Sequence, residues 1–225
     1  LLRPELPNLI KAWNLLGLLD FIRAKSLLSN EYKCVVPEIT DEPTFLWRQA
    51  RHPLLEQKLK SQNKHITPLD LSLDKDNRIL VISGPNAGGK SVCLKTIGLV
   101  QYMLQCGLAV PMEIDSRCGI FHDMFIDIGD SQSLENDLST YSSHLINMKE
   151  LLSHANKRTL FLIDEFGTGT EPQLGGAIAE AILLKMNEKK SFGVVTTHYA
   201  NLKLLADNHK GIVNGAMLFD TRYLQ

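Results

Sequence analysis

Short apolar runs separated by polar, glycine-containing turns recur along most of the chain and predict an α/β fold. Strands are expected at the apolar, largely β-branched or aromatic runs 79–82, 160–163, 192–196 and 211–219. Helices are expected where apolar positions recur at helical spacing, at residues 90–106, 145–152 and 172–187. We therefore expect a three-layer α/β domain in which helices cover a central sheet.

The first forty residues predict a helical appendage to this domain. Apolar side chains recur at helical spacing from Asn8 to about Asn30, interrupted by Gly17. We interpret this segment either as a helix that packs on the rest of the molecule or as the end of a lever or coiled coil. Polar, proline-containing residues follow and indicate a boundary, so we divide the chain into residues 1–40 and 41–225.

The segment before the first strand of the central sheet predicts further strands and loops. Residues 45–47 and 67–73 have the composition or the alternation of strands, and residues 62–67 form a polar loop. A loop at this place can contact a nucleotide base, which makes His65 and Ile66 candidates, although an ordinary surface loop also explains them. Additional short strands are expected at residues 107–111 and 124–128.

The glycine-rich turn after residues 79–82 matches the phosphate-binding pattern G-x-x-x-x-G-K-[ST] at every fixed position. Glycines let successive backbone N–H groups point at phosphates, and the helix that follows adds the positive end of its dipole. Lys90 can reach the β- and γ-phosphates, and the Ser91 hydroxyl is placed to bind Mg²⁺. A glycine turn without a ligand is the weaker alternative. The candidate ATP-binding residues are Gly84, Pro85, Asn86, Ala87, Gly88, Gly89, Lys90, Ser91 and Val92.

Two acidic residues follow the apolar run 160–163 and are candidates for catalysis. A carboxylate at the end of a buried strand is costly unless it meets a cation. Asp164 therefore fits as a residue that holds the Mg²⁺ shell, and Glu165 as the base that orients and polarises the attacking water. Two solvent-facing acids are the weaker alternative, because the phosphate-binding turn lies upstream.

Two further polar features lie where phosphate ligands are expected. His198 follows the strand 192–196, and ligands of parallel α/β sheets collect at the carboxyl ends of the strands. We therefore expect His198 to reach the γ-phosphate. A hydroxyl-rich stretch around Ser139 and Thr140 precedes an apolar helix, where hydroxyls either cap the helix or bind an anion. Both interpretations of that stretch stay open.

Composition adds limits rather than a function. The net charge of −1 does not favour a chain that coats nucleic acid. No stretch is long and apolar enough to span a membrane and no signal peptide opens the chain, so we expect a cytoplasmic protein. The chain begins without methionine and stops soon after a predicted strand, so we expect a piece of a larger protein. Reduced, buried thiols without C-x-x-C spacing are expected for Cys34, Cys93, Cys106 and Cys118.

Together the motifs resemble the ATPase domain of MutS proteins, a branch of the ABC ATPases, from about Phe21 to the end. The resemblance is carried by Gly84–Ser91, Ser139–Thr140, Asp164–Thr170 and Thr197–Tyr199. Finer similarity to bacterial MutS paralogues that often carry a C-terminal Smr domain lies at residues 50–55, 127–133 and 138–144. Ala87, Phe166 and Thr168 differ from the residues usual in mismatch-repair MutS proteins.

The resemblance implies an ABC-type P-loop ATPase that uses ATP and Mg²⁺, with Glu165, His198 and Lys90 as catalytic residues. It also implies a homodimer joined through the ATPase face, in which Ser139 meets the ATP of the partner. Branched or mismatched DNA would be bound by domains absent from this chain, and no membrane is involved. DNA mismatch repair, recombination control and ribosome rescue stay open, with the ribosome as an alternative partner.

Three other classes can be weighed against this interpretation. A transporter ABC domain would carry L-S-G-G-Q before its signature helix, and the residues before Thr140 do not match it. A P-loop kinase would need a second substrate site and no Glu165. A scaffold that binds ATP without hydrolysing it would have lost Glu165, which is present.

Overall fold

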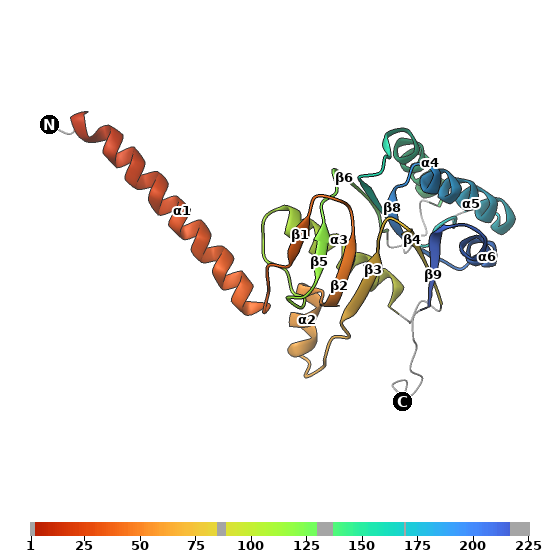
Figure 1. Cartoon of the computed structure of the whole chain (residues 1–225), viewed down its shortest axis with the longest axis horizontal. Helices are drawn as coiled ribbons and strands as arrows, with labels where there is room; N and C mark the ends of the chain where they lie inside the picture. Colours follow the sequence, from red (N-terminus) through yellow and green to blue (C-terminus); the bar gives the residue numbers. More distant parts are fainter. Residues whose placement is uncertain (1–2, 85–88, 130–136, 169, 217–225) are drawn as a thin grey trace.

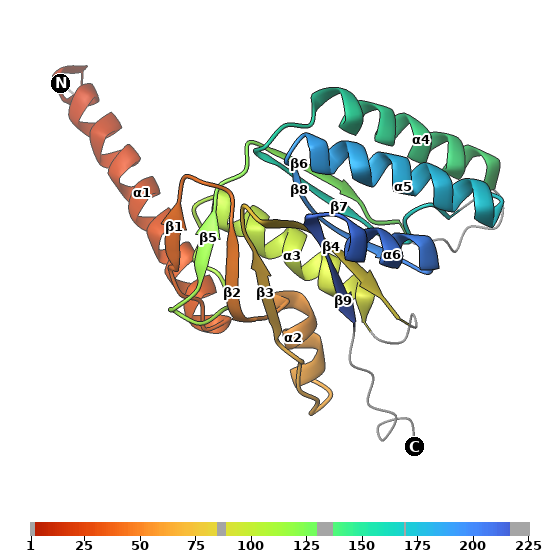
Figure 2. The same ribbon diagram turned by 45° about the vertical axis from the view of Figure 1, so that its right-hand side comes forward.

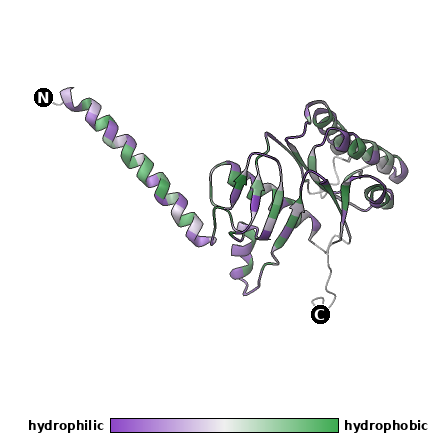
Figure 3. Cartoon of the chain, in the orientation of Figure 1, coloured by the Kyte–Doolittle hydropathy of each residue, from purple (hydrophilic) through white to green (hydrophobic). Residues whose placement is uncertain are grey.

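The computed structural model describes residues 3–84, 89–129, 137–168 and 170–216, and the side chains of residues 137–143 and 216 lie outside this description. A long helical arm projects from the body of the molecule (Figure 1). It comprises a 3-10 turn, η1 (Arg3–Glu5), and helix α1 (Leu6–Glu31), in which no residue is buried. Apolar and polar residues alternate along its whole length (Figure 3). The expected helix is therefore present, but most of it does not contact the described body. Its last turn does, since Glu31 accepts a hydrogen bond from Gln57 over 3.2 Å. The lever or coiled-coil end stays a prediction.

A five-stranded parallel sheet forms the centre of the body, in the strand order β6-β7-β8-β4-β9. Its strands are β4 (Asn77–Ser83), β6 (Asp123–Asp127), β7 (Thr159–Ile163), β8 (Phe192–Thr197) and β9 (Gly211–Ala216). Every residue of β7 and β8 is buried, as expected for strands covered on both faces. Since all five strands run the same way, their carboxyl ends lie along one edge of the sheet.

Helices cover both faces of this sheet (Figure 2). One face packs against α3 (Lys90–Gln105), through a core that includes Leu94, Ile97, Leu160 and Leu162. The other face packs against α4 (Asp137–His154), α5 (Pro172–Glu188) and α6 (Ala200–Asn208). The predicted three-layer α/β arrangement is confirmed, and the order of the strands requires the helical crossovers that build these layers.

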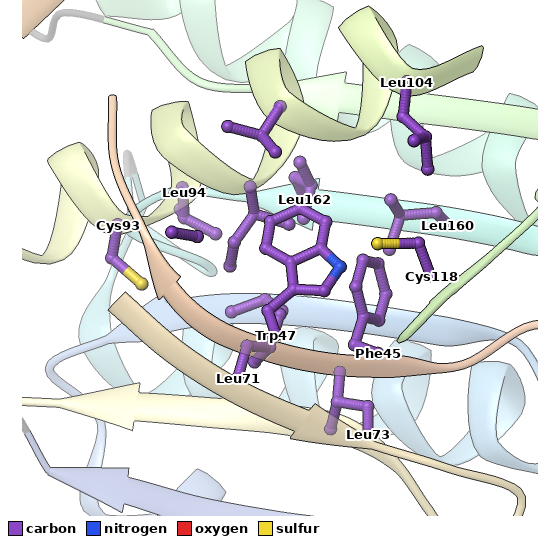
Figure 4. Close-up of a cluster of buried hydrophobic side chains, with 14 of the residues drawn as sticks. Phe45, Trp47, Leu71, Leu73, Cys93, Leu94, Leu104, Cys118, Leu160 and Leu162 are labelled. Carbon is purple, nitrogen blue, oxygen red and sulfur yellow. The ribbon is translucent and has the colours of Figure 1, made fainter. Parts of the chain in front are cut away.

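A second, mixed sheet covers the outer side of α3, in the order β1-β5-β2-β3. It consists of β1 (Glu38–Thr40), β2 (Phe45–Ala50), β3 (Leu69–Leu73) and β5 (Arg117–Gly119). The Phe45 and Trp47 side chains, each 1% exposed, point from β2 toward α3 and β7 (Figure 4). Their rings meet edge to face at 5.0 Å, an arrangement that favours a fixed core.

Some local predictions differ from the structure. Residues 53–60 form a short helix, α2 (Pro53–Lys60), because the His52 imidazole caps the Leu55 N–H and proline occupies the first turn. Residues 107–111 form no strand; only Val110 makes a bridge, to Val35. Strands β1 and β5 are three residues each, and their sequences have no pattern that predicts a strand. None of the four cysteines forms a disulfide. Cys93 and Cys118 are buried as expected, but Cys34 is half-buried and Cys106 is exposed.

Candidate nucleotide-binding site

The phosphate-binding sequence lies between the carboxyl end of β4 and the first residue of α3. Gly84, at the end of β4, has a φ of 140° and space around its Cα, and Gly89, just before α3, has a φ of 80°. Both angles favour glycine, since a Cβ atom makes them strained. Residues 85–88 lie outside the described residues, so the predicted roles of Pro85, Asn86, Ala87 and Gly88 stay predictions.

Lys90 is the most unusual residue at this place, because its side chain is almost fully buried, at 2% exposure. Its ammonium group donates to the Gly84 carbonyl oxygen over 2.5 Å and lies 3.3 Å from Nε2 of His198. Burial lowers the pKa of the Lys90 ammonium group, and the nearby carboxylates of Glu165 and Asp164 oppose that effect. A positive charge held in this way favours an anionic ligand.

The predicted carboxylates follow β7, the second strand from β4. Asp164 and Glu165 are half-buried, and the Asp164 N–H donates to the Asp127 carbonyl oxygen at the end of β6 over 2.9 Å. Glu165 has a φ of 48°, the left-handed conformation that is uncommon outside glycine. The unusual backbone angle lies directly at the predicted catalytic base, where such outliers suggest function.

The turn after Glu165 is shaped by close packing against α5. Gly167 has a φ of 92°, and a Cβ atom there would lie 2.8 Å from the Gly175 carbonyl oxygen. The Tyr199 hydroxyl donates to the Gly167 carbonyl oxygen over 3.0 Å. The absence of side chains at Gly167 and Gly175 therefore lets α5 pack closely against this turn at the edge of the site.

A polar pair connects the site to helix α4. Nδ1 of His144 lies 2.7 Å from an Asp127 carboxylate oxygen. The hydrogen bond to Asp127 raises the pKa of His144, against a smaller opposing effect of burial. Both side chains line a small cavity together with Asp164 and Glu165. We did not predict this pair, because it joins a strand end to a helix 17 residues later with no local pattern.

The outcome for the remaining candidates is mixed. Ser91 is half-buried in the first turn of α3, and Val92 is exposed there. His65 and Ile66 lie in the loop between α2 and β3, and among the described residues neither hydrogen bonds to the phosphate-binding turn. The backbone of Ser139 lies in the first turn of α4, but its side chain is outside the described residues. The contact of His65 or Ile66 with a nucleotide base and the role of Ser139 stay predictions.

The side chains present fit a nucleoside triphosphate with Mg²⁺. Lys90 and the start of α3 would hold phosphate oxygens, and Ser91 and Asp164 would hold the metal. Within the described residues no group of three or more His, Cys, Asp or Glu side chains could hold a metal ion. A magnesium site of this type does not need one, because phosphates and water supply most of its ligands.

The three-layer fold, with a phosphate-binding sequence between β4 and α3, places the chain in the P-loop NTPase class. The chain belongs to the MutS family, since the family model described as MutS domain V matches residues 80–223. A protein of Enterococcus faecalis named Endonuclease MutS2 is 45% identical over 205 residues, covering 91% of this chain and 25% of that protein. The proteins of the same name from Lactiplantibacillus plantarum and Geobacillus sp. are 41% and 42% identical, over 100% and 96% of this chain and 28% and 27% of their own lengths.

The resemblance to the MutS ATPase domain and to the bacterial paralogue lineage is thereby confirmed. The chain spans about a quarter of the length of these relatives. Among the helices that the structure describes, none has the length and apolar character needed to cross a membrane.

Proposed function

We propose that this chain is the ATP-binding and ATP-hydrolysing domain of a MutS-family protein. The observation that carries the proposal is the buried Lys90 ammonium group, held between the start of the phosphate-binding turn and His198, with Asp164 and Glu165 at the end of β7, the strand next to β8. Membership of the MutS family supports the same conclusion.

Each side chain has a distinct role in this proposal. Lys90 neutralises the β- and γ-phosphates, while Ser91 and Asp164 hold Mg²⁺, which supplies charge stabilisation when it is bound. Glu165 accepts a proton from the attacking water, and His198 contacts the γ-phosphate from the end of β8. The contact between the Lys90 ammonium group and His198 supports the placement of Lys90 and His198 around one phosphate.

The ATP cycle would switch a dimeric nucleic-acid clamp whose DNA-binding parts lie elsewhere in the protein. We propose a homodimer joined through the ATPase face, in which Ser139 contacts the nucleotide of the partner. Light scattering on the full-length protein tests the predicted dimer, because a molecular mass that stays monomeric with ATP would contradict a homodimer. The relatives' name, Endonuclease MutS2, favours the paralogue lineage, so we place recombination control or ribosome rescue beside mismatch repair as candidate processes.

Two substitutions separate binding from chemistry in the full-length protein. Lys90→Ala removes a charge-assisted contact worth about 1.5–3 kcal/mol, so ATP affinity should fall by about 10- to 150-fold in titration calorimetry. Glu165→Gln keeps size and hydrogen bonding but cannot act as a base, so ATP should still bind while turnover falls by about 10²- to 10⁴-fold.

Exposed residues provide the matched controls for these two variants. Lys11→Ala on α1 and Glu150→Gln on α4 make the same chemical changes far from the strand ends, and both should behave as wild type. Unchanged ATP affinity in Lys90→Ala would refute the binding site. Wild-type turnover in Glu165→Gln would refute the assignment of the base.

A further inference from the structure

Thr196, the second-last residue of β8, joins the two predicted catalytic carboxylate residues. It is fully buried, at 0% exposure, and its hydroxyl donates to Oδ1 of Asp164 over 2.5 Å. The same hydroxyl oxygen accepts the Glu165 N–H over 2.8 Å. One side chain on a neighbouring strand therefore contacts both the carboxylate assigned to Mg²⁺ and the backbone of the residue assigned as base.

The main chain of Thr196 continues this arrangement. Its carbonyl oxygen accepts the Phe166 N–H over 2.8 Å, so two successive amides after Asp164 are held by a single residue of β8. These bonds bracket Glu165, whose φ of 48° costs energy for a residue with a side chain. Such a conformation persists only where surrounding contacts fix it, and Thr196 supplies the contacts on both sides.

The hydrogen bond to Asp164 also restricts the carboxylate itself. Oδ1 receives the Thr196 hydroxyl and lies 3.2 Å from the Glu165 N–H. Among the described residues, Oδ2 of Asp164 accepts no hydrogen bond. The carboxylate is therefore held through one oxygen and presents the other, which is how outer partners orient a metal-binding carboxylate.

Two of the other three buried threonines among the described residues show what a purely structural hydroxyl does. The Thr96 hydroxyl donates to the Val92 carbonyl oxygen in its own helix, and the Thr159 hydroxyl oxygen accepts the Asn156 N–H at the opposite end of β7. Both bond only to nearby backbone. Thr196 differs from them because it bonds across strands to an ionisable side chain.

We propose that Thr196 is a positioning residue that orients Asp164 toward Mg²⁺ and holds Glu165 in its productive backbone conformation. The proposal rests on the proposed function, since it assigns Thr196 a role in the same site. Removing an outer partner of a metal-binding group commonly lowers metal affinity by about 10- to 100-fold. Loss of the Thr196 hydroxyl should therefore weaken metal binding before it affects nucleotide binding.

The test compares three variants of the full-length protein. Thr196→Val keeps the shape and removes the hydroxyl, Thr196→Ser keeps the hydroxyl and removes a methyl group, and Thr159→Val removes a buried hydroxyl remote from the site. The probe is Mn²⁺ with ADP, and its affinity is read from the electron paramagnetic resonance signal of free Mn²⁺. ATPase rate as a function of Mg²⁺ concentration and denaturant unfolding are measured on the same samples.

We expect Thr196→Val to weaken Mn²⁺ binding about 10-fold or more and to shift the ATPase half-saturation to higher Mg²⁺ by a similar factor. Thr196→Ser and Thr159→Val should stay within about threefold of wild type in Mn²⁺ affinity, although Thr159→Val should lower the unfolding free energy as Thr196→Val does. If Thr196→Val does not fold, Thr196→Ala against Thr196→Ser makes the same comparison.

Three results would overturn the inference: Mn²⁺ affinity within threefold of wild type in Thr196→Val, equal weakening in Thr196→Ser, or equal weakening in Thr159→Val. A wild-type protein that binds no Mn²⁺ with ADP would instead refute the proposed function itself. The two failures are therefore distinguishable.

Discussion

Helices α1 and α3 are both rich in leucine and other apolar residues, yet their surroundings are opposite. No residue of α1 is buried, and Trp13 is 78% exposed. In α3, by contrast, Leu94 and Ile97 are fully buried between the two sheets. The difference shows that apolar content predicts a helix well but does not predict which neighbours cover it.

The consequence for function is that α3 is fixed and α1 is not. Because α3 is held along its length, its first residue, Lys90, has a defined place at the carboxyl ends of β4 and β8. Beyond its last turns, α1 has no such constraint within the described residues, and an apolar surface of this extent usually marks an interaction site. Apolar residues therefore fix the position of the site through α3, whereas on α1 they remain exposed.

The largest expected difference is between two leucine truncations in the 225-residue chain. Leu94→Ala removes a side chain with 0% exposure between the sheets and should lower the free energy of unfolding by about 2–5 kcal/mol. Leu16→Ala on α1 removes a side chain that is 65% exposed and should change the free energy of unfolding by less than about 0.5 kcal/mol. Urea denaturation measures both. Equal losses would contradict the comparison, because they would mean that α1 is packed in solution.

Much of α3 and its sheet could be predicted from the sequence because the signals are local. The strand residues 79–82, the glycine-rich turn and the helix after it follow one another directly, and each has its own pattern. The positions of Asp164 and His198 at the edge of the sheet could be predicted for the same reason, since each follows a buried strand. These features need only the neighbouring residues for their prediction.

The features that sequence reasoning missed depend on distant partners. Strand β1 exists because it pairs with β5, where Glu38 lies opposite Arg117, 79 residues later in the chain. Neither strand has a sequence pattern that predicts it alone. Thr196 could be placed only as a strand residue, because its role requires knowing that β7 and β8 are neighbours in the sheet. The Asp127–His144 pair needed the packing of α4 on the sheet for the same reason.

Substitution of one glycine in α1 and one in α3 should give a smaller difference in stability between the two helices. A Cβ atom on Gly17 of α1 would meet nothing within 4 Å, whereas on Gly98 of α3 it would lie 3.1 Å from Cδ1 of Leu162. Gly17→Ala should therefore gain about 1 kcal/mol of helix stability from propensity alone. Gly98→Ala should lose up to about 2 kcal/mol, because crowding against fully buried Leu162 exceeds that gain.

Hydrogen exchange read by mass spectrometry reports both glycine substitutions, since it resolves the local stability of each helix. Slower exchange in α1 of Gly17→Ala and faster exchange in α3 of Gly98→Ala are the expected results. Equal slowing in both helices would show that Leu162 moves aside and that α3 is less tightly held than its burial indicates.

The smallest expected effect concerns α4, a helix attached partly by apolar residues and partly by the Asp127–His144 pair. The hydrogen bond to Asp127 raises the pKa of His144 in the folded state, so the folded protein binds that proton more tightly than the unfolded chain. The resulting stability is fully present below the unfolded pKa, about 6.5, and is lost as the pH rises through the folded pKa. Since the His144 side chain is 37% exposed, solvent screens the pair and the effect should stay below about 1 kcal/mol.

Denaturant unfolding at pH 5.5 and pH 8.5 tests this prediction in wild type and in Asp127→Asn and His144→Gln variants. The wild type should lose more stability between the two pH values than either variant, because each variant removes one partner of the pair. Asp127→Asn is the more informative variant, since its amide keeps a hydrogen bond to His144 while removing the charge that favours the protonated ring. A wild type that gains stability relative to Asp127→Asn as the pH rises would contradict the assigned sign, and would mean that the neutral imidazole is the form that holds α4 to the sheet.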